Sequence, residues 1–434
     1  MQIRIIAGFA MAVATGCGST SQTGAAAADR SVSVAGLPAC APDNGGLTLP
    51  TGFCAAVVHE GVGPARHISV TPDGRVYVAL RDVRGETGGI VGLRDTDGDG
   101  ILDEMVRFGD RGGTGIAVRG EYLYFAPNTA VVRYRLPADG ALEPQGSPET
   151  IVDGFPEQRG HAAKTLAFGD DGSLWVNVGG PSNACQEPDR QPGVRGQDPC
   201  PQLDLQAGVW RYQGGTPGQK HEAGARWATG IRNAVALAYN PADRGLYAVQ
   251  HGRDQLDMWD AFEPAENTEL PSEEFIRVEQ GANFGWPYCY HDPGANRRVL
   301  APEYGGDGVE VGRCAAFAQP LTAYPAHWAP NDLLFYSGGQ FPQSYRGGAF
   351  IAWHGSWNRS PPQRGYKITF QPMTAGGTTG EWEVFADGFA GDEVLQSSGD
   401  ARHRPMGLAE GPDGTLYVVD SKEGTIWRII YRGS

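Results

Sequence analysis

The sequence predicts an all-β fold, a six-bladed β-propeller closed by pairing of the N-terminal strand with the C-terminal blade. Three observations support this prediction. The chain of 434 residues contains 64 glycines and 31 prolines, and no long stretch keeps the 3.6-residue apolar period of a helix. A hairpin unit recurs six times along the chain. The chain begins its first unit with an outer strand and ends with inner strands.

The repeated unit has a short strand, a glycine-containing loop, an apolar strand, a Pro/Asp/Gly turn and an aromatic-centred strand. Four-stranded units repeated in this way are typical of propeller blades stacked round a central channel. The segments HISV, LAF, VALAY and MGLA are almost wholly apolar and are expected to be innermost strands. Four copies are clear and two are looser; they begin at Val57, Ile151, Arg226, Val384 (resuming at Arg402), and at Gly113 and Ala329.

The two ends of the chain predict how the ring closes. Residues 53–61 read as an outer strand, whereas the last two strands, GTLYVVD and GTIWRIIYR, are the inner strands of a blade. The N-terminal strand can therefore complete the C-terminal blade, which leaves few exposed sheet edges.

The first residues predict export. Arg4 precedes an apolar run, residues 5–14, that is too short to span a bilayer and is typical of a secretory signal. The sequence that follows, up to Cys17, is similar to a bacterial lipoprotein cleavage box, although leucine is usual where Ala14 stands. We therefore expect a lipid-carrying Cys17 and a periplasmic protein anchored to the cell envelope, with plain secretion as the alternative.

The composition sets the expected domain boundaries. The segment after Cys17 is small and polar, cannot bury a core and is expected to be a flexible tether. The expected organisation is a signal peptide with its lipid-attachment box at 1–17, a tether at 18–36 and a propeller at 37–434.

The cysteines also favour an oxidising compartment. With Cys17 set aside, six remain, and they form three pairs of sequence neighbours. Such pairs can form local disulfides, although six cysteines allow many pairings and buried free thiols are an alternative. No Cys-x-x-Cys motif indicates a metal cluster. The expected pairs are Cys40 with Cys54, Cys185 with Cys200, and Cys289 with Cys314.

The charge excludes one class of partner. The formal net charge is −15 and there is no run of lysine and arginine. Nucleic-acid binding needs a concentrated basic surface, so a nucleic-acid partner is not expected.

Cations recur at one position of the repeat, in the loop that leads into the innermost strand. In a propeller these loops meet at one mouth of the channel. Like charges at close range are unfavourable unless an anion lies among them, so the sequence predicts an anion site. The alternative is that each cation pairs with a nearby acidic residue. The four loops carry Arg66-His67, Arg159 with His161, Arg232-Asn233, and Arg402-His403-Arg404.

Loops after the aromatic-centred strands supply further candidates for the same mouth. The glycine-rich run GGTG at 112–115 allows a flat ligand to approach the backbone closely. The remaining candidates are His251, Arg253 and Asp254 in HGRDQLDMW, and His354, Trp357, Asn358 and Arg359 in HGSWNR.

An acidic loop, RDTDGDGILDE, is a candidate calcium site. Its alternating carboxylates resemble a calcium-binding loop, but the closing glutamate of an EF-hand is missing, since Val106 stands at the twelfth position. The alternative is a solvated Asp-Gly turn. The candidate ligands are Asp95, Asp97, Asp99 and Asp103.

Several motifs resemble those of the soluble PQQ-dependent sugar dehydrogenases, most of all the sorbosone dehydrogenase branch, with soluble glucose dehydrogenase and the aldose sugar dehydrogenases as wider relatives. They extend over residues 53–431. Two of the motifs, NFGWPYCY and HGSWNR, are distinctive. The others are RGHAAKTLAFGDDGSLWVNVG, GIRNAVALAYNP, HGRDQLDMW and HRPMGLAEGPDGTLYVVDSKEGTIWRI.

The resemblance implies an oxidoreductase that oxidises a sugar or related polyol or aldehyde with PQQ and calcium and passes electrons to an external acceptor. PQQ, a flat tricarboxylated quinone, would lie across the channel mouth. His161 would be the general base, a role that suits histidine, and Arg232 would act beside it. The backbone of Gly252 and Arg253 would hold calcium. The implied PQQ or substrate contacts are Arg66, Lys164, Arg232, Asn233, His251, Arg253, His354, Arg359 and Arg404.

The sequence departs from the family pattern in two places. Ala162-Ala163 follow His161 where the glucose dehydrogenases have a different pair, and the HGRDQLD loop is less acidic than their calcium loop. His354 could therefore share or take over the role of base. Two other classes remain as alternatives: a metal-dependent lactonase, which needs carboxylates and an asparagine on the channel axis, and a propeller that binds a ligand without catalysis.

Overall fold

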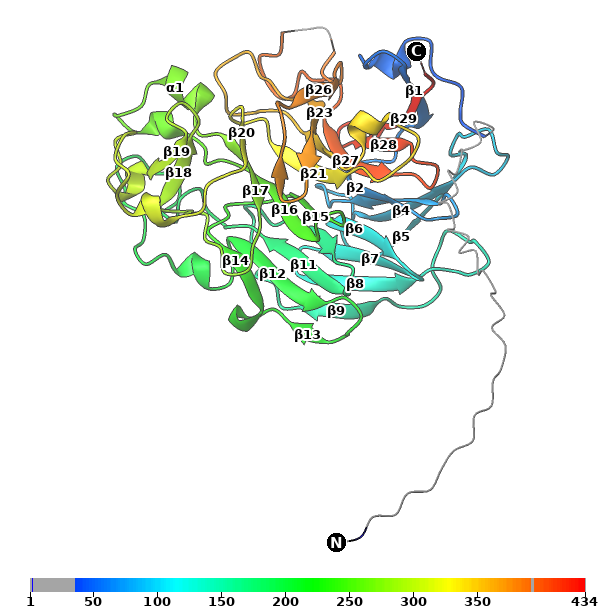
Figure 1. Ribbon diagram of the computed structural model, residues 1–434, viewed down its shortest axis with the longest axis horizontal. Helices are drawn as coiled ribbons and strands as arrows, with labels where there is room; N and C mark the ends of the chain where they lie inside the picture. The colour runs from blue at the N-terminus through cyan, green and yellow to red at the C-terminus, as the bar shows by residue number, and fades with distance from the viewer. Residues whose placement is uncertain (1, 3–35, 392–393, 434) are drawn as a thin grey trace. The chain divides into compact units, whose positions relative to one another are not determined.

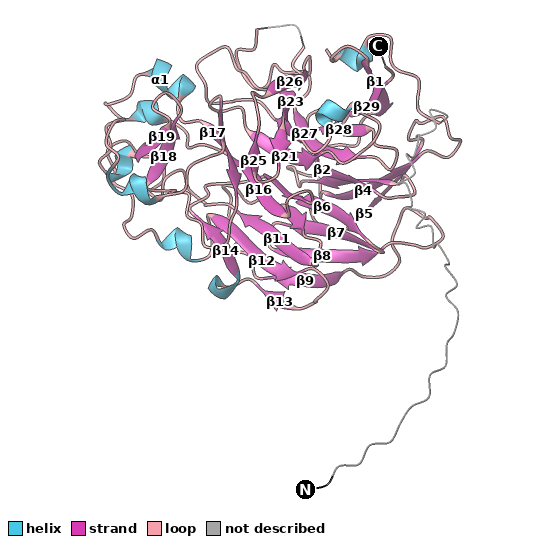
Figure 2. Ribbon diagram, viewed as in Figure 1, coloured by secondary structure: helices cyan, strands magenta, loops and turns pink. Residues whose placement is uncertain are grey.

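The structure is a computed structural model that describes residue 2, residues 36–391 and residues 394–433. The predicted signal peptide, Cys17 and nearly all of the predicted tether therefore lie outside the described residues. Strands dominate the described part, and its short helices lie in loops outside the main sheets (Figure 2). No helix among the described residues is both long enough and apolar enough to cross a membrane.

Six sheets of four or five strands form the blades, which confirms the predicted six-bladed propeller (Figure 1). The first blade has β2 (Ala65–Val70), β3 (Val76–Leu80), β4 (Gly89–Arg94) and β5 (Glu104–Phe108). The second has β6 (Gly113–Arg119), β7 (Tyr122–Pro127), β8 (Ala130–Arg135), β9 (Glu149–Asp153) and, parallel to β9, β13 (Gln219–Lys220). The third has β10 (Leu166–Phe168), β11 (Ser173–Val178), β12 (Gly208–Gln213) and β14 (Arg226–Thr229).

The second half of the ring has the same plan. The fourth blade has β15 (Ala236–Asn240), β16 (Gly245–Gln250), β17 (Glu273–Arg277) and β20 (Thr322–Tyr324). The fifth has β21 (Pro330–Phe335), β22 (Ala349–Trp353), β23 (Lys367–Gln371) and β26 (Glu383–Ala386). The sixth has β27 (Pro405–Glu410), β28 (Leu416–Asp420), β29 (Ile426–Tyr431) and β1 (Phe53–His59).

The remaining elements belong to insertions between these strands. The single α-helix among the described residues, α1, is Pro264–Glu269, and two small hairpins pair β18 (Cys289–Asp292) with β19 (Arg297–Leu300) and β24 (Met373–Thr374) with β25 (Gly377–Thr378). The 3-10 helices are η1 (Asn44–Gly46), η2 (Pro201–Asp204), η3 (Ala223–Ala225), η4 (Leu256–Met258), η5 (Pro302–Tyr304), η6 (Gly312–Ala316) and η7 (Gln343–Tyr345).

The ring closes as the sequence predicts. Strand β1 pairs antiparallel with β29, from Phe53 opposite Tyr431 to Val57 opposite Trp427 (Figure 1). The first strands of adjacent blades lie against one another all the way round, in the order β2, β6, β10, β15, β21, β27 and back to β2.

The core is divided among the blade interfaces. Each pair of adjacent blades encloses its own cluster of buried apolar side chains, and Tyr336, Phe350 and Phe370 belong to the cluster between the fifth and sixth blades. The second strands are the most completely buried; every residue of β3, β11, β16, β22 and β28 is buried. Three of the four predicted innermost segments include half-buried residues, whereas MGLA on β27 is buried throughout.

The three predicted disulfides are confirmed. Each bond restrains a loop or an end of the chain that the β-sheets do not hold by themselves. The pairs are Cys40–Cys54, Cys185–Cys200 and Cys289–Cys314.

Candidate functional site

A cavity of about 530 Å³ lies where the first strands of the blades begin and the second strands end. These two points are adjacent in every antiparallel hairpin, and all six blades contribute to the wall. Most of the lining is polar or charged. It includes six arginines, four histidines and three carboxylic acids: Arg66, Arg81, Arg159, Arg190, Arg232 and Arg404; His161, His251, His327 and His354; and Asp82, Asp254 and Glu273.

The structure brings most of the residues predicted from the sequence to this one cavity. All four cation-bearing loops contribute a side chain to its wall. The predicted site residues that line the cavity are Arg66, His161, Arg232, Asn233, His251, Gly252, His354 and Arg404.

Lys164 lies behind the wall instead. Its side chain is fully buried, and Nζ donates a hydrogen bond to the carbonyl oxygen of Ala162 across 2.7 Å. The ring of Phe155 lies 5.9 Å from the ammonium group. Burial lowers the pKa of Lys164 to about 7.

Arg253 and Arg359 also lie away from the cavity wall. Arg253 is buried and forms an ion pair with Glu303. The Arg359 guanidinium donates to the carbonyl oxygens of Thr268 and Ala326, at 2.6 and 3.0 Å, and pairs with Glu269. Both side chains therefore hold neighbouring loops together.

One side of the cavity carries three arginines that have no carboxylate partner among the described residues: Arg66, Arg81 and Arg404. Arg66 donates only to the hydroxyl of Thr114, at 3.2 Å, and Arg404 donates to the carbonyl oxygens of His354 and Gly355, at 3.0 and 2.9 Å. Burial, together with the charges of Arg81 and Arg404, lowers the pKa of Arg66 to about 9. This uncompensated positive charge is the environment that an anionic ligand would relieve.

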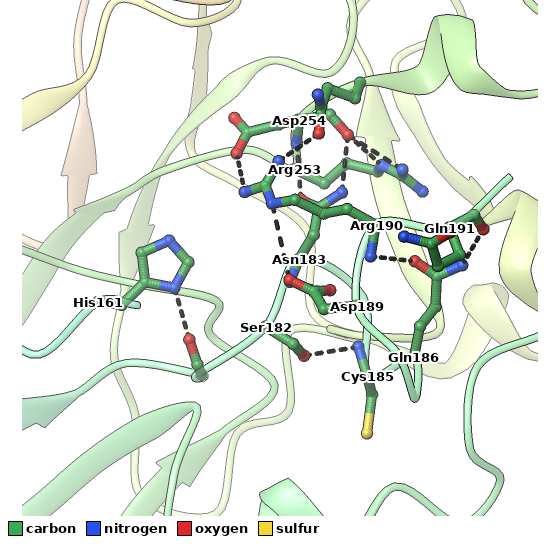
Figure 3. A network of polar contacts seen from close by, with 12 residues as sticks. His161, Ser182, Asn183, Cys185, Gln186, Asp189, Arg190, Gln191, Arg253 and Asp254 are labelled. Atoms are coloured by element: carbon green, nitrogen blue, oxygen red, sulfur yellow. Dashed lines mark hydrogen bonds and ion pairs between the residues drawn. The ribbon is translucent and has the colours of Figure 1, made fainter. Parts of the chain in front are cut away.

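The other side carries a compensated network centred on Asp254. One oxygen of its carboxylate accepts hydrogen bonds from Arg232 and Arg190, each at 2.7 Å, and Asn183 bonds to Arg232 and to the Asp254 backbone. Figure 3 shows Asn183 and Arg190 turned toward Asp254. Burial alone would raise the pKa of Asp254, but the two arginines outweigh it and hold that pKa well below its ordinary value.

His161 has its ring fixed by a backbone carbonyl. Its Nδ1 lies 2.5 Å from the oxygen of Gly180 (Figure 3). Because a carbonyl only accepts, Nδ1 carries the hydrogen and Nε2 is left with a free lone pair. Burial, followed by the charge of Arg232, lowers the pKa of His161 to about 3, so the imidazole is neutral near pH 7.

The backbone at His161 is unusual and is held by its surroundings. Its φ is +50°, a left-handed conformation that is uncommon outside glycine. The Gln158 amide donates to the His161 carbonyl at 3.0 Å, and Gly179 lies so close that a Cβ there would come within 2.6 Å of the His161 Cβ. Positions of this kind recur at functional sites, where the surrounding structure maintains the strain.

The other histidines of the wall are also neutral near pH 7. Burial and then Arg232 lower the pKa of His251 to about 4, whereas burial, Arg404 and Arg66 lower that of His354 well below its ordinary value. Nε2 of His354 has a partner, the Ser421 hydroxyl at 2.7 Å. This contact distinguishes His354 from His161, whose Nε2 has none among the described residues.

Several residues of the wall were missed in the sequence. Arg81 follows the second strand of its blade, as His251 and His354 follow theirs, so the repeat itself could have identified it. His327 and Asn331 lie just before and at the start of the first strand of the fifth blade, which is also the repeated position. Arg190 and Glu273 lie in a long insertion and on a later strand, where the repeat gives no signal.

The acidic loop between β4 and β5 is separate from the cavity. Asp95, Asp97 and Asp99 cluster there, whereas Asp103 accepts hydrogen bonds from Thr96 instead of joining them. The oxygens of Asp95 accept backbone hydrogens of the same turn. Calcium binding by this loop stays a prediction.

Curated relatives match parts of the chain. A protein of Borreliella burgdorferi without an assigned function is 30% identical over 206 residues, covering 47% of this chain and 48% of the relative. The PQQ-dependent pyranose dehydrogenase of Coprinopsis cinerea is 27% identical, covering 46% of this chain and 30% of the relative. The PQQ-dependent sugar dehydrogenase of Hypocrea jecorina is 26% identical, covering 47% and 48%. The matches thus span half or less of each relative.

Solved structures share the fold over nearly their whole length. The Trichoderma reesei protein of Carbohydrate-Active Enzymes Family AA12 superposes with a TM-score of 0.73 at 19% identity, covering 89% of this chain and 98% of that one. The PQQ domain of Coprinopsis cinerea pyranose dehydrogenase superposes with a TM-score of 0.69 at 18% identity, covering 91% and 98%.

The family profile described as TrAA12-like matches residues 47–432, which is nearly the whole propeller. PQQ-dependent sugar dehydrogenases stand among the relatives, so the resemblance to that family is confirmed, whereas the sorbosone dehydrogenase branch stays a prediction. The chain belongs to the TrAA12-like family.

Proposed function

We propose that this protein is a PQQ-dependent sugar dehydrogenase, which oxidises a CH–OH group of a sugar or a related polyol or aldehyde. One observation carries the proposal. The cavity combines three arginines without carboxylate partners, Arg66, Arg81 and Arg404, with a neutral His161 whose Nε2 is free. The relatives that act on sugars with PQQ support the same conclusion.

The residues of the wall fit PQQ. Guanidinium groups bind carboxylates through charge-assisted hydrogen bonds, often in pairs. The three arginines would hold carboxylates of the cofactor, and their mutual repulsion would fall when an anion enters. The backbone of Gly112 and Gly113 borders the same cavity, and both residues must be glycine because a Cβ would collide with the backbone of Asp82 or Ala126.

The opposite wall fits calcium in the chemistry of its donors. Calcium takes oxygen ligands, and Gly252, Asp254 and Glu273 bring a carbonyl and two carboxyl groups to the cavity. In this structure the Gly252 carbonyl accepts from Arg232 at 2.9 Å. The Gly252 carbonyl and the Asp254 carboxylate would hold the ion, and the Arg253 backbone carbonyl follows directly in the chain. A structure of the Trichoderma reesei relative is described as its calcium structure.

The chemistry divides between the bound groups and the chain. The chemistry that bound PQQ and calcium would supply is acceptance of the hydride that leaves the substrate carbon. His161 takes the hydroxyl proton of the substrate on Nε2, while Nδ1 keeps its hydrogen bond to Gly180. The substrate would thus lose a hydride from carbon and a proton from the hydroxyl oxygen, and the CH–OH group would become a carbonyl. Arg232, held by Asp254 and Asn183, keeps a positive charge beside the base.

The electrons leave to an external acceptor, which is a separate partner. We propose that the protein works in the periplasm, anchored through a lipid on Cys17, or outside the cell after plain secretion. The three disulfides support an oxidising compartment.

The proposal is tested by adding PQQ and calcium to the purified protein and following an artificial electron acceptor over a panel of sugars, polyols and aldehydes. PQQ-dependent reduction of the acceptor by at least one of these substrates is the expected result. PQQ binding without any oxidation would favour a non-catalytic propeller. Lactone hydrolysis with no PQQ binding would favour the lactonase class.

A further inference from the structure

One aromatic side chain lies among the charged groups of the cavity wall and is not part of the core. Trp357 follows β22 and lines the cavity, and 56% of it is exposed. All ten tryptophans lie among the described residues, and Trp357 is the one that is exposed. Apart from the histidines it is also the one aromatic residue of the described wall.

The indole has no structural partner that explains its position. Among the described residues it stacks on no other aromatic ring and takes part in no hydrogen bond. Leaving a large apolar side chain in water forgoes the free energy of burying it. A truncated side chain at this position would therefore cost the fold little, and the reason for the indole lies outside the folded chain itself.

The backbone that carries Trp357 is firmly held on both sides. The residue before it, Ser356, is fully buried; its hydroxyl donates to Gln363 at 2.7 Å, and its carbonyl accepts from Tyr366 at 2.6 Å. The residue after it, Asn358, donates to the Asp254 carboxylate at 2.6 Å. The loop thus presents the indole at a fixed place on the wall.

Contacts at both ends of the loop also hold its backbone in place. Gly355 has φ +88°, and a Cβ there would lie 2.1 Å from the ring of Tyr366. Arg359 closes the other end of the loop through the Thr268 and Ala326 carbonyls. A rigid loop with one exposed aromatic residue is typical of a preformed binding surface, because little ordering entropy remains to be lost on binding.

We propose that Trp357 is a stacking platform for a ring of the carbohydrate substrate at the mouth of the cavity. A sugar ring presents aliphatic C–H groups on one face and hydroxyls round its edge. An indole face matches the first, and the charged and amide groups of the wall match the second. Arg66, Arg81 and Arg404 lie on the first and sixth blades, whereas Trp357 follows a strand of the fifth, so the indole is assigned to the sugar and not to the cofactor carboxylates.

This inference rests on the proposed function, and its test compares Trp357→Ala and Trp357→Phe with the wild type, each loaded with PQQ and calcium. We expect Trp357→Ala to raise KM for the preferred sugar about 3- to 10-fold while kcat changes less than about twofold. Trp357→Phe keeps an aromatic face and is expected to retain most of the affinity. Met105→Ala, which truncates an exposed apolar side chain on β5 away from the cavity, is the matched control and leaves KM unchanged.

A direct binding readout separates this inference from the proposed function. With ¹⁵N-labelled tryptophan, the indole signal that disappears in Trp357→Phe is expected to shift when the same sugar is added. An unchanged KM in Trp357→Ala, together with an unmoved indole signal, would overturn the inference while leaving the dehydrogenase activity in place. Loss of PQQ affinity in Trp357→Ala would also overturn it, by assigning the indole to the cofactor. If the wild type oxidises no sugar, the proposed function fails first.

Discussion

His161 donates its Nδ1 hydrogen to the carbonyl oxygen of Gly180 across 2.5 Å, and this bond leaves Nε2 unprotonated on a side chain that lines the cavity. The hydrogen bond selects one tautomer, and the pKa, lowered to about 3 by burial and by Arg232, keeps the ring neutral. A neutral imidazole with a free nitrogen is the state that a general base requires before it takes a proton.

We expect His161→Ala and His161→Gln to lower turnover by about 10²- to 10⁴-fold, because a general base is removed. PQQ binding is expected to change little, since the carboxylate-binding arginines remain. Steady-state kinetics at saturating PQQ, with a parallel binding titration, measure both quantities. Near-normal turnover in both variants would show that His161 is not the general base. The next candidate to test would be His354, whose Nε2 is bonded to Ser421.

Arg404→Ala is expected to weaken PQQ binding about 10- to 100-fold, as the loss of a charge-assisted hydrogen bond implies. The melting temperature of the ligand-free protein is expected to stay equal or rise, because Arg404 lowers the pKa of nearby Arg66 through repulsion. Calorimetric titration and thermal melts measure the two effects. Arg135→Ala, an exposed arginine paired with Glu121, is the control; equal PQQ affinity in both variants would argue against the anion site.

Arg232→Ala is expected to behave differently from Arg404→Ala. Arg232 is buried and already paired with Asp254, so its removal leaves that carboxylate with Arg190 as its remaining ion-pair partner. Breaking a buried pair is costly, and the ligand-free variant is expected to melt at a lower temperature. Excess PQQ is expected to restore part of the rate. A variant that is as stable as the wild type would contradict the role of Arg232 in the Asp254 network.

Removing the Cys185–Cys200 disulfide, through the paired alanine substitutions, is expected to cost about 3 kcal/mol of stability. Arg190 lies in the loop that this bond closes, and Asn183 lies just before Cys185. Both residues hold Asp254 at the cavity, so activity is also expected to fall. The matched control removes Cys40–Cys54, which closes a loop of similar length away from the cavity. If both variants lost the same activity for each degree by which the melting temperature falls, the Cys185–Cys200 bond would affect activity through stability alone.

Lys164→Met is expected to make the protein more stable at pH 6, by at least about 2 °C in melting temperature. The pKa of Lys164 is about 7 in the folded protein and 10.5 when unperturbed, so the unfolded chain binds more protons between these values. The buried charge therefore destabilises the wild type most below pH 7. The difference in melting temperature between the two proteins becomes smaller as the pH rises toward 10.5. Melting curves from pH 6 to pH 10 follow this convergence.

Lys220→Met is the control for this experiment, because Lys220 is exposed and paired with Asp153. A difference between wild type and Lys164→Met that stays constant with pH would contradict the assignment of the buried charge. The same variant also tests the contact implied by the family resemblance: a large loss of PQQ affinity would place Lys164 at the cofactor, although the structure places it behind the wall.

The fold could be predicted because its signals are local. Each hairpin repeats a turn and an apolar strand, and β1 at one end needs the partner that β29 provides at the other. The disulfide pairs were also accessible, since each joins neighbours in sequence. The repeat does not show that second strands such as β16 are the most completely buried, because burial depends on how neighbouring blades pack.

The site could be predicted in part. Residues at a repeated position, such as Arg66 and Arg404, come together because the ring brings equivalent loops to one place. The repeat does not predict the direction in which a side chain points. Lys164 points into the core, although nearby His161 lines the cavity. Asn183 and Arg190 could not be found, because they reach the site from a long loop whose path depends on tertiary contacts.

The most direct test of the central claim is a calorimetric titration of PQQ into the calcium-loaded wild-type protein, repeated with a variant that carries Arg66→Ala and Arg404→Ala. The account predicts saturable binding of one PQQ per chain, a higher melting temperature of the complex, and a loss of affinity of at least about 100-fold in the double variant. Absence of saturable binding to the wild type, or equal affinity in the double variant, would contradict it.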